Sequence, residues 1–169
     1  MIVVIAGVAG CGKTTVGLLL ANRLHCEFAD GDAFHPAANI EKMEAGIPLT
    51  DDDRWPWLRA IVAWMDARAA AGESAVVACS ALKRSYREVL LSGSAGARMV
   101  FLEVPLGADQ ARLARRAGHF FPSALLESQF AALELPQPSE PVLTVPAVGT
   151  PEQTADQVMK VLGLQPGGA

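Results

Sequence analysis

The chain has 169 residues, of which 51% are hydrophobic, and a formal net charge of -4 at pH 7, so its length suits one domain with a single core. Its acidic balance and scattered Lys and Arg residues predict no nucleic-acid partner, and no apolar run reaches the about 18 residues that a membrane span needs. Three widely spaced cysteines, an odd number, favour reduced thiols and a cytoplasmic location over a disulfide framework.

The sequence alternates short apolar runs with helical patterns, which predicts an α/β fold with a five-stranded parallel sheet and helices on both faces. Strands are expected at Ile2–Ala6, Glu27–Ala29, Ala75–Cys79, Met99–Val104 and Val142–Val145. Helices are expected at Gly12–Leu24, Ala37–Glu44, Trp55–Ala71, Lys83–Ser92, Ala108–Ala117, Ser123–Leu133 and Pro151–Leu162. Residues 1–164 would form one three-layer domain with a small helical lid at about 118–136, followed by a flexible tail at 165–169.

The first strand runs directly into Gly7-Val8-Ala9-Gly10-Cys11-Gly12-Lys13-Thr14, a complete G-x-x-x-x-G-K-[ST] phosphate-binding loop. Its glycines let the backbone point successive N–H groups at phosphate oxygens, Lys13 adds a charge for the β- and γ-phosphates, and Thr14 offers a hydroxyl to Mg²⁺. The helix that follows directs its positive end at the same anion. We therefore expect a nucleoside triphosphate to contact Gly7, Ala9, Gly10, Cys11, Gly12, Lys13, Thr14 and Thr15.

Two carboxylates, Asp30 and Asp32, follow the second expected strand. In a doubly wound sheet they should lie at the edge that carries the phosphate loop. One can hold Mg²⁺ directly or through water, and the other can orient an attacking hydroxyl; the alternative is a polar Asp-Gly turn. The strand expected at Ala75–Cys79 ends without the acid that many phosphate-loop ATPases use for Mg²⁺, which disfavours a mechanical ATPase or a GTPase switch.

Basic residues near the same edge are candidates for binding an anionic substrate. Lys83 and Arg87 are four residues apart on one helical face, although a solvated basic helix start would look the same. Arg54 follows three acids, Asp51–Asp53, which could hold its guanidinium in place for a carboxylate. These acids are also typical of a helix N-terminus ahead of Trp55.

A further arginine cluster precedes Gly118-His119-Phe120-Phe121-Pro122, a segment suited to a hinged lid. Arg112 and Arg116 share a helical face. One guanidinium of such a lid can stack on adenine while another neutralises the transferring phosphate once closure excludes water. The alternative is a basic helix end that complements its own dipole.

Taken together, these segments resemble the gluconokinases, small kinases in the shikimate-kinase-like branch of phosphate-loop kinases. The matching segments cover most of the chain in the family's order: Asp30–Pro36, Asn39–Met43, Gly46–Leu49, Asp51–Arg54, Pro56–Leu58, Cys79–Lys83, Tyr86-Arg87, Gly118–Phe121 and Gln129-Phe130. The sequence departs from the pattern at Thr50, where Asn is expected, and at Pro122-Ser123, where a more basic lid is expected.

The resemblance implies a phosphate-loop kinase fold and ATP-dependent phosphorylation of D-gluconate at the 6-hydroxyl, giving 6-phospho-D-gluconate and ADP. It also implies ATP and Mg²⁺ as cofactors and a homodimer. The first alternative is another small-molecule kinase, of the shikimate or nucleoside-monophosphate type. The second is a nucleotide-dependent binding module without acceptor chemistry. No membrane or nucleic-acid partner is expected.

In this scheme Lys13, Asp32 and Arg116 would be catalytic, with Asp32 orienting or deprotonating the 6-hydroxyl. Thr14 and Asp30 would serve the metal, and Arg112 would contact the nucleotide. The residues expected to bind the substrate are Asp32, His35, Arg54, Lys83, Arg87, His119 and Gln129. For His35 the alternative is a cap on the helix that begins near Pro36.

Overall fold

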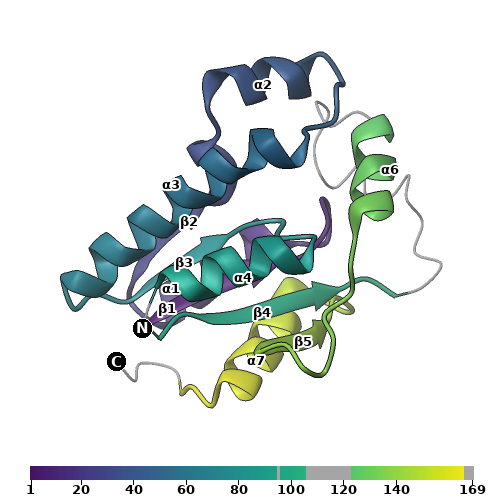
Figure 1. The fold of residues 1–169 in the computed structure, drawn as a ribbon. Coiled ribbons are helices and arrows are strands. Elements are labelled where there is room, and N and C mark those ends of the chain that lie inside the picture. The colour runs from purple at the N-terminus through teal and green to yellow at the C-terminus, as the bar shows by residue number, and fades with distance from the viewer. Residues whose placement is uncertain (95, 106–122, 166–169) are drawn as a thin grey trace.

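The computed structural model describes residues 1–94, 96–105 and 123–165 (Figure 1). Its parallel sheet has five strands in the order β2-β3-β1-β4-β5. The strands are β1 (Ile2–Ala6), β2 (Glu27–Asp30), β3 (Ala75–Ala78), β4 (Arg98–Glu103) and β5 (Val142–Pro146). The helices are α1 (Lys13–Arg23), α2 (Ala37–Glu44), α3 (Asp51–Ala70), α4 (Arg84–Gly93), α6 (Ser123–Ala132) and α7 (Pro151–Leu162), and Gly31–Phe34 forms a 3₁₀ turn, η1.

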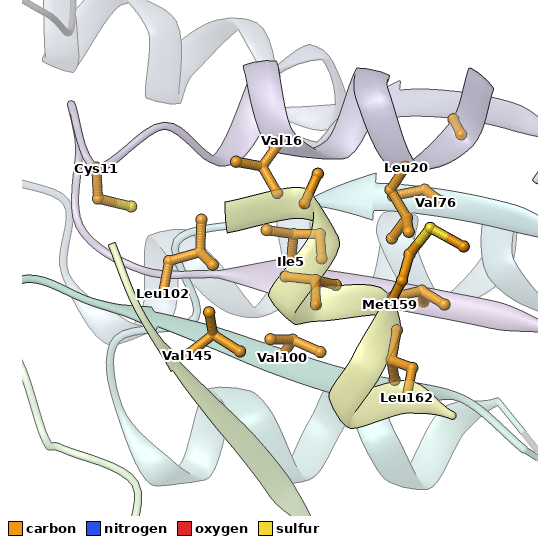
Figure 2. Packing of buried hydrophobic residues seen from close by; sticks show 14 of the residues in the cluster. Ile5, Cys11, Val16, Leu20, Val76, Val100, Leu102, Val145, Met159 and Leu162 are labelled. Atoms are coloured by element: carbon orange, nitrogen blue, oxygen red, sulfur yellow. The ribbon is translucent and has the colours of Figure 1, made fainter. Parts of the chain in front are cut away.

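Side chains of β1 alternate between two hydrophobic layers, one on each face of the sheet. Val3 and Ile5 face the layer made by α1 and α7, where Val16 of α1 and Met159 of α7 belong to the same hydrophobic cluster (Figure 2). Ile2, Val4 and Ala6 face the other layer, with α3 and α4. Burial on both faces explains why this strand reads as an unbroken apolar run. The predicted three-layer α/β architecture is therefore confirmed.

Most expected elements agree with the structure to within one residue at each end, but α3 begins at Asp51 and not at Trp55. Thr50 and Asp53 explain the difference, because they form a capping box in which each side chain accepts a hydrogen bond from the other's backbone N–H. The helix expected at 108–117 lies outside the described residues. Within the described ranges no helix has both the length and the apolar character needed to cross a membrane.

The carboxyl ends of β1, β2 and β3 lie level at one edge of the sheet. Ala78 of β3 pairs with Ile5 on one side and with Asp30 on the other. Just beyond this edge Gly7 donates its N–H to the Ser80 carbonyl at 3.2 Å. Gly31 lies so close to the Ala78 carbonyl that a Cβ there would collide with backbone. The register thus presses the Asp30–Asp32 turn and the phosphate loop against the same strand end.

Candidate functional site

The phosphate loop joins β1 to the N-terminus of α1. Gly7, Gly10 and Gly12 have φ values of 142°, 75° and 103°, a region that side-chain-bearing residues rarely adopt. A Cβ on Gly7 would also lie 2.8 Å from Cys11 Sγ, so only glycine leaves room for the Cys11 side chain at this point of the loop. The Lys13 ammonium donates to the Val8 carbonyl at 2.9 Å, which holds its charge over the loop. Backbone, charge and helix end together form an anion site.

A cavity of ≈ 270 Å³ lies at this edge of the sheet. Its wall is formed by the phosphate loop, the Asp30–Asp32 turn, the start of α3, the helix α6 and the loop between β5 and α7. The predicted site residues that the structure brings together in this wall are Ala9, Gly10, Cys11, Gly12, Lys13, Thr14, Thr15, Asp30, Asp32, His35, Arg54 and Gln129. The phosphate loop and the polar groups predicted to bind a substrate therefore line the same cavity.

Asp30 is held at both oxygens of its carboxylate. It accepts a hydrogen bond from the Thr14 hydroxyl at 2.9 Å and another from the Asp32 backbone N–H at 3.0 Å. A hydroxyl and a carboxylate are oxygen ligands of the kind that a small divalent cation prefers. Since no group of three or more His, Cys, Asp or Glu side chains converges within the described ranges, such a cation would take most of its ligands from phosphate and water.

Asp32 faces the cavity from the turn that Asp30 caps. Surrounding protein raises the pKa of its carboxyl above the usual value, and the Asp30 charge raises it further, while Lys13 opposes both effects. A carboxylate made more basic in this way is a better proton acceptor. Asp32 can therefore orient a hydroxyl and take its proton.

His35 lies flat on Trp57, with ring centroids 4.3 Å apart and an angle of 13° between the planes. The Trp57 indole N–H in turn donates to the Gly31 carbonyl at 2.7 Å. Burial and the nearby Arg54 charge lower the pKa of His35 to about 4, so the ring is neutral at neutral pH. The alternative role as a helix cap is wrong, because α2 has no side-chain cap and His35 Nδ1 pairs with the Asn39 side chain.

Arg54 enters the cavity wall from the first turns of α3. Its Nε donates to the Leu49 carbonyl at 3.4 Å, and its guanidinium lies 5.6 Å from the centroid of the Tyr86 ring. The expected support from Asp51–Asp53 is not what holds it: in the described part of the chain Arg54 forms no salt bridge with these acids. A carbonyl and an aromatic ring position this cation.

Lys83 lies outside the cavity wall, in contrast to the expectation that it faces the substrate. Its ammonium pairs with Asp51 at 2.8 Å and lies 5.7 Å from the Tyr86 ring centroid. The Tyr86 hydroxyl donates a second, short hydrogen bond to the same Asp51 oxygen. Asp51 thus ties Lys83 and Tyr86 together beside the Arg54 guanidinium.

Arg87 is a structural residue, and its prediction as a substrate contact is wrong. It is 1% exposed, and its Nε and Nη2 donate to Glu140 at 2.7 and 3.0 Å. Its Nη1 donates to the carbonyls of Leu82 and Glu134. This buried, bidentate pair fastens the segment after α6 to α4, and it leaves no face of the guanidinium for a ligand.

Helix α6 stands beside the carboxyl edge of the sheet, away from both helical layers (Figure 1). Its Gln129 Oε1 accepts the Ala9 N–H of the phosphate loop at 2.7 Å. Gln129 therefore links this helix to the loop. The remaining predicted site residues, Arg112, Arg116 and His119, lie outside the described residues.

Sequence reasoning missed the residues that support the site. Asn39 and Tyr86 belong to the segments that carry the resemblance, but neither was assigned a role. The contact of Tyr86 with Arg54 depends on how α3 and α4 meet, and the hydrogen bond from Asn39 to the Asp53 carbonyl depends on how α2 and α3 meet. The sequence shows only that a polar or aromatic residue lies in a segment near a candidate ligand-binding residue. The role of that residue becomes clear only from its contacts in the folded protein.

Comparison with protein families identifies the group of kinases to which these features correspond. The shikimate kinase family model matches residues 9–129. The gluconokinase of Gluconobacter oxydans (strain 621H) is 46% identical over 157 residues, which cover 93% of this chain and 88% of that protein. The thermosensitive gluconokinase of Escherichia coli (strain K12) is 45% identical over 137 residues, 81% of this chain and 73% of that protein.

Solved structures with a similar fold include kinases. A sugar kinase from Janibacter sp. HTCC2649, in an unliganded structure, has a TM-score of 0.88 at 45% identity and covers 98% of this chain and 95% of its own. A gluconokinase from Sinorhizobium meliloti 1021 has a TM-score of 0.76 at 40% identity, with 95% and 94% covered. The APS kinase CysC of Mycobacterium tuberculosis, at 20% identity and a TM-score of 0.68, shares the fold.

The Arg87–Glu140 pair predicts a large loss of stability on removal of one partner. Glu140→Ala should lower the free energy of unfolding by about 3 to 5 kcal/mol, because it leaves a buried guanidinium without its counter-charge. Glu88→Ala, which removes the exposed partner of Arg84, should lower the free energy of unfolding by less than about 1 kcal/mol. Urea unfolding followed by circular dichroism measures both. Equal losses would contradict a structural role for Arg87.

Proposed function

The chain belongs to the gluconokinase family of phosphate-loop kinases, and on that premise we propose that it transfers the γ-phosphoryl group of ATP to the 6-hydroxyl of D-gluconate. The observation that carries this proposal is the single cavity in which the phosphate loop meets Asp32, His35 and Arg54. The loop suits a triphosphate, and the other three groups suit an acid with several hydroxyls.

For the nucleotide, Lys13 and the backbone N–H groups of Gly10–Thr14 would hold the phosphates. Thr14 directly and Asp30 through water would hold Mg²⁺, which when bound offsets the negative charge of the phosphate oxygens. Arg112 would stack on adenine and Arg116 would neutralise the transferring phosphate; both roles rest on the sequence argument for a lid that carries arginines.

For the transfer itself, Asp32 would accept the proton of the 6-hydroxyl at its carboxylate as the oxygen attacks the γ-phosphorus. A new bond joins O6 to the γ-phosphorus while the bond from that phosphorus to the β,γ-bridging oxygen breaks, so that ADP leaves. The pKa of Asp32, raised by burial and by Asp30, favours this proton acceptor. Fixed positions of loop and carboxylate supply the alignment that the reaction needs.

For gluconate, Arg54 would bind the carboxylate and His35 a hydroxyl. Lys13 and Arg54 are the lysine and arginine among the described residues of the cavity wall, and Lys13 serves the phosphates. Lys83 is engaged by Asp51, so we propose it as an indirect support of substrate binding. His119 and Gln129 would add hydroxyl contacts from a lid at about 118–136, with the contact of Gln129 to Ala9 as support.

Assembly and location complete the proposal. A homodimer rests on the resemblance to gluconokinases. A cytoplasmic location is supported by the three unpaired thiols of Cys11, Cys26 and Cys79, which suit a reducing compartment.

The direct test is an ADP-release assay with a panel of acceptors. We expect D-gluconate to be preferred over shikimate, other aldonates and AMP, with 6-phospho-D-gluconate as product. Equal or faster turnover of another acceptor would reject gluconate as the substrate. ATP hydrolysis with no phosphorylated product would reject acceptor chemistry altogether.

Replacing Asp32 tests its role in transfer. Asp32→Asn keeps the size of the side chain but cannot accept the hydroxyl proton, so kcat should fall by about 10² to 10⁴ with little change in the KM for ATP. Steady-state kinetics with D-gluconate measure both constants. A kcat near that of the unmodified enzyme would refute the assignment.

Replacing Arg54 tests the carboxylate contact. Arg54→Ala should raise the KM for D-gluconate about ten- to hundredfold, as expected for the loss of a charge-assisted hydrogen bond. Inhibition by D-glucitol, which carries an alcohol in place of the carboxylate, should change by less than about threefold. Lys83→Ala is the matched control and should affect gluconate binding less than Arg54→Ala. If Arg54→Ala weakens the binding of D-glucitol and of D-gluconate equally, Arg54 does not contact the carboxylate.

A further inference from the structure

Asn39 is a buried polar residue on α2, 4% exposed, and its side-chain amide connects two parts of the site. Its Nδ2 donates to the backbone carbonyl of Asp53 at 2.8 Å. The same nitrogen lies 3.2 Å from His35 Nδ1. Asn39 thus bridges the start of α3 and the imidazole that enters the cavity wall.

Hydrogen-bond chemistry decides which way this amide is oriented. The Asp53 carbonyl can only accept, so the Asn39 atom 2.8 Å from it must be the NH₂ group; a flipped amide would place two acceptor oxygens against each other. The second hydrogen of that NH₂ group points to His35 Nδ1, which must then be the ring nitrogen with a free lone pair. A neutral imidazole that accepts at Nδ1 carries its proton on Nε2.

Nε2 is the ring nitrogen of His35 that remains for a ligand in the cavity. One face of the ring stacks on Trp57, and Nδ1 is occupied by Asn39. Within the described residues Nε2 has no hydrogen-bond partner, yet it is not among the buried polar atoms that lack one, Arg68 Nε and Ser94 Oγ. Because His35 lines the cavity, its Nε2–H is accessible from there.

We propose that Asn39 is a positioning residue that fixes His35 as the Nε2–H tautomer and so makes it a neutral hydrogen-bond donor to a substrate hydroxyl oxygen. The identity of that oxygen rests on the proposed function; the tautomer does not. The selection resembles the way a second hydrogen-bond partner fixes the tautomer of a metal-binding or catalytic histidine.

The charges around His35 agree with a ring that stays neutral. Arg54 of α3, Lys13 of α1 and the carboxylates of Asp30 and Asp32 share the cavity wall with it. Burial has the largest effect on the His35 pKa and Arg54 the next, and both lower it, to about 4. Above that pH the Nε2–H donor depends on Asn39 and not on protonation of the ring.

Asn39→Asp tests this dependence, because a carboxylate cannot donate to Nδ1 and instead draws a proton onto it. In the neutral ring Nε2 then loses its hydrogen, whereas the protonated ring keeps one on each nitrogen. The KM for D-gluconate should therefore be about three- to tenfold above that of the unmodified enzyme at pH 8 and should approach it as the pH is lowered through the raised pKa of His35. The KM for ATP should not follow this change.

Lys42→Met is the control for a purely structural effect, because Lys42 also joins α2 to α3, through its ion pair with Asp53 at 2.8 Å, without touching His35. It should change the KM for D-gluconate by less than about twofold at either pH. A rise equal to that of Asn39→Asp, or a rise in Asn39→Asp that does not depend on pH, would overturn the proposal.

Imidazole ¹⁵N NMR of the unmodified protein reads the tautomer without any substrate. The chain has three histidines, and the signals of His35 are identified by their absence in His35→Gln. We expect the proton on Nε2 at pH 7 to 8, and a proton on Nδ1 would overturn the proposal even if Asn39→Asp fails to fold. Failure to phosphorylate gluconate would instead reject the proposed function and leave the tautomer assignment standing.

Discussion

The parallel register of β1, β2 and β3 is the constraint on which the site depends. It brings three strand ends to one level, with Ala78 between Ile5 and Asp30. The phosphate loop and the Asp30–Asp32 turn must then lie side by side, and Gly31 permits the close contact with β3. The Thr14 hydroxyl reaches Asp30 across this junction at 2.9 Å. The phosphate loop and the turn that we propose for the acceptor thus line one cavity.

Charge pairing then decides which basic groups remain for a ligand. Arg87 is neutralised inside the protein by Glu140, and Lys83, outside the cavity wall, is neutralised by Asp51. Lys42 is likewise paired with Asp53, whose pKa falls to about 2 through bonds to Lys42 and Thr50. Arg54 is held by a carbonyl and an aromatic ring, neither of which cancels its charge. Among the described residues Arg54 forms no salt bridge, and a cation held in this way is suited to an anionic substrate.

The sequence alone was sufficient to predict site residues whose roles depend on neighbours in the chain. It was insufficient for residues whose roles depend on how distant segments pack together. The phosphate loop and Asp30–Asp32 could be placed because loop, strand end and helix start are contiguous in the chain. Arg87 could not be assigned correctly, because its partner Glu140 is 53 residues away and the pairing exists only after the chain returns over α4. The start of α3 was missed because the acids Asp51–Asp53 were interpreted as a cap ahead of Trp55, whereas the cap is Thr50 and the acids form the first turn of the helix.

The proposed site would bind two anions at once, and the arrangement around His35 bears on the electrostatic problem that this creates. A triphosphate and a carboxylate repel each other, and further fixed cations would favour the ground-state anions as much as the transition state. The Arg54 charge, together with burial, keeps the neighbouring imidazole neutral. His35 can then offer a directional hydrogen bond from a neutral ring. The stacked Trp57 and the Asn39 amide hold that ring in place from two sides. In the proposed function, specificity for the hydroxyls of the substrate would thus come from a rigid neutral donor, and attraction for its carboxylate from a separate cation.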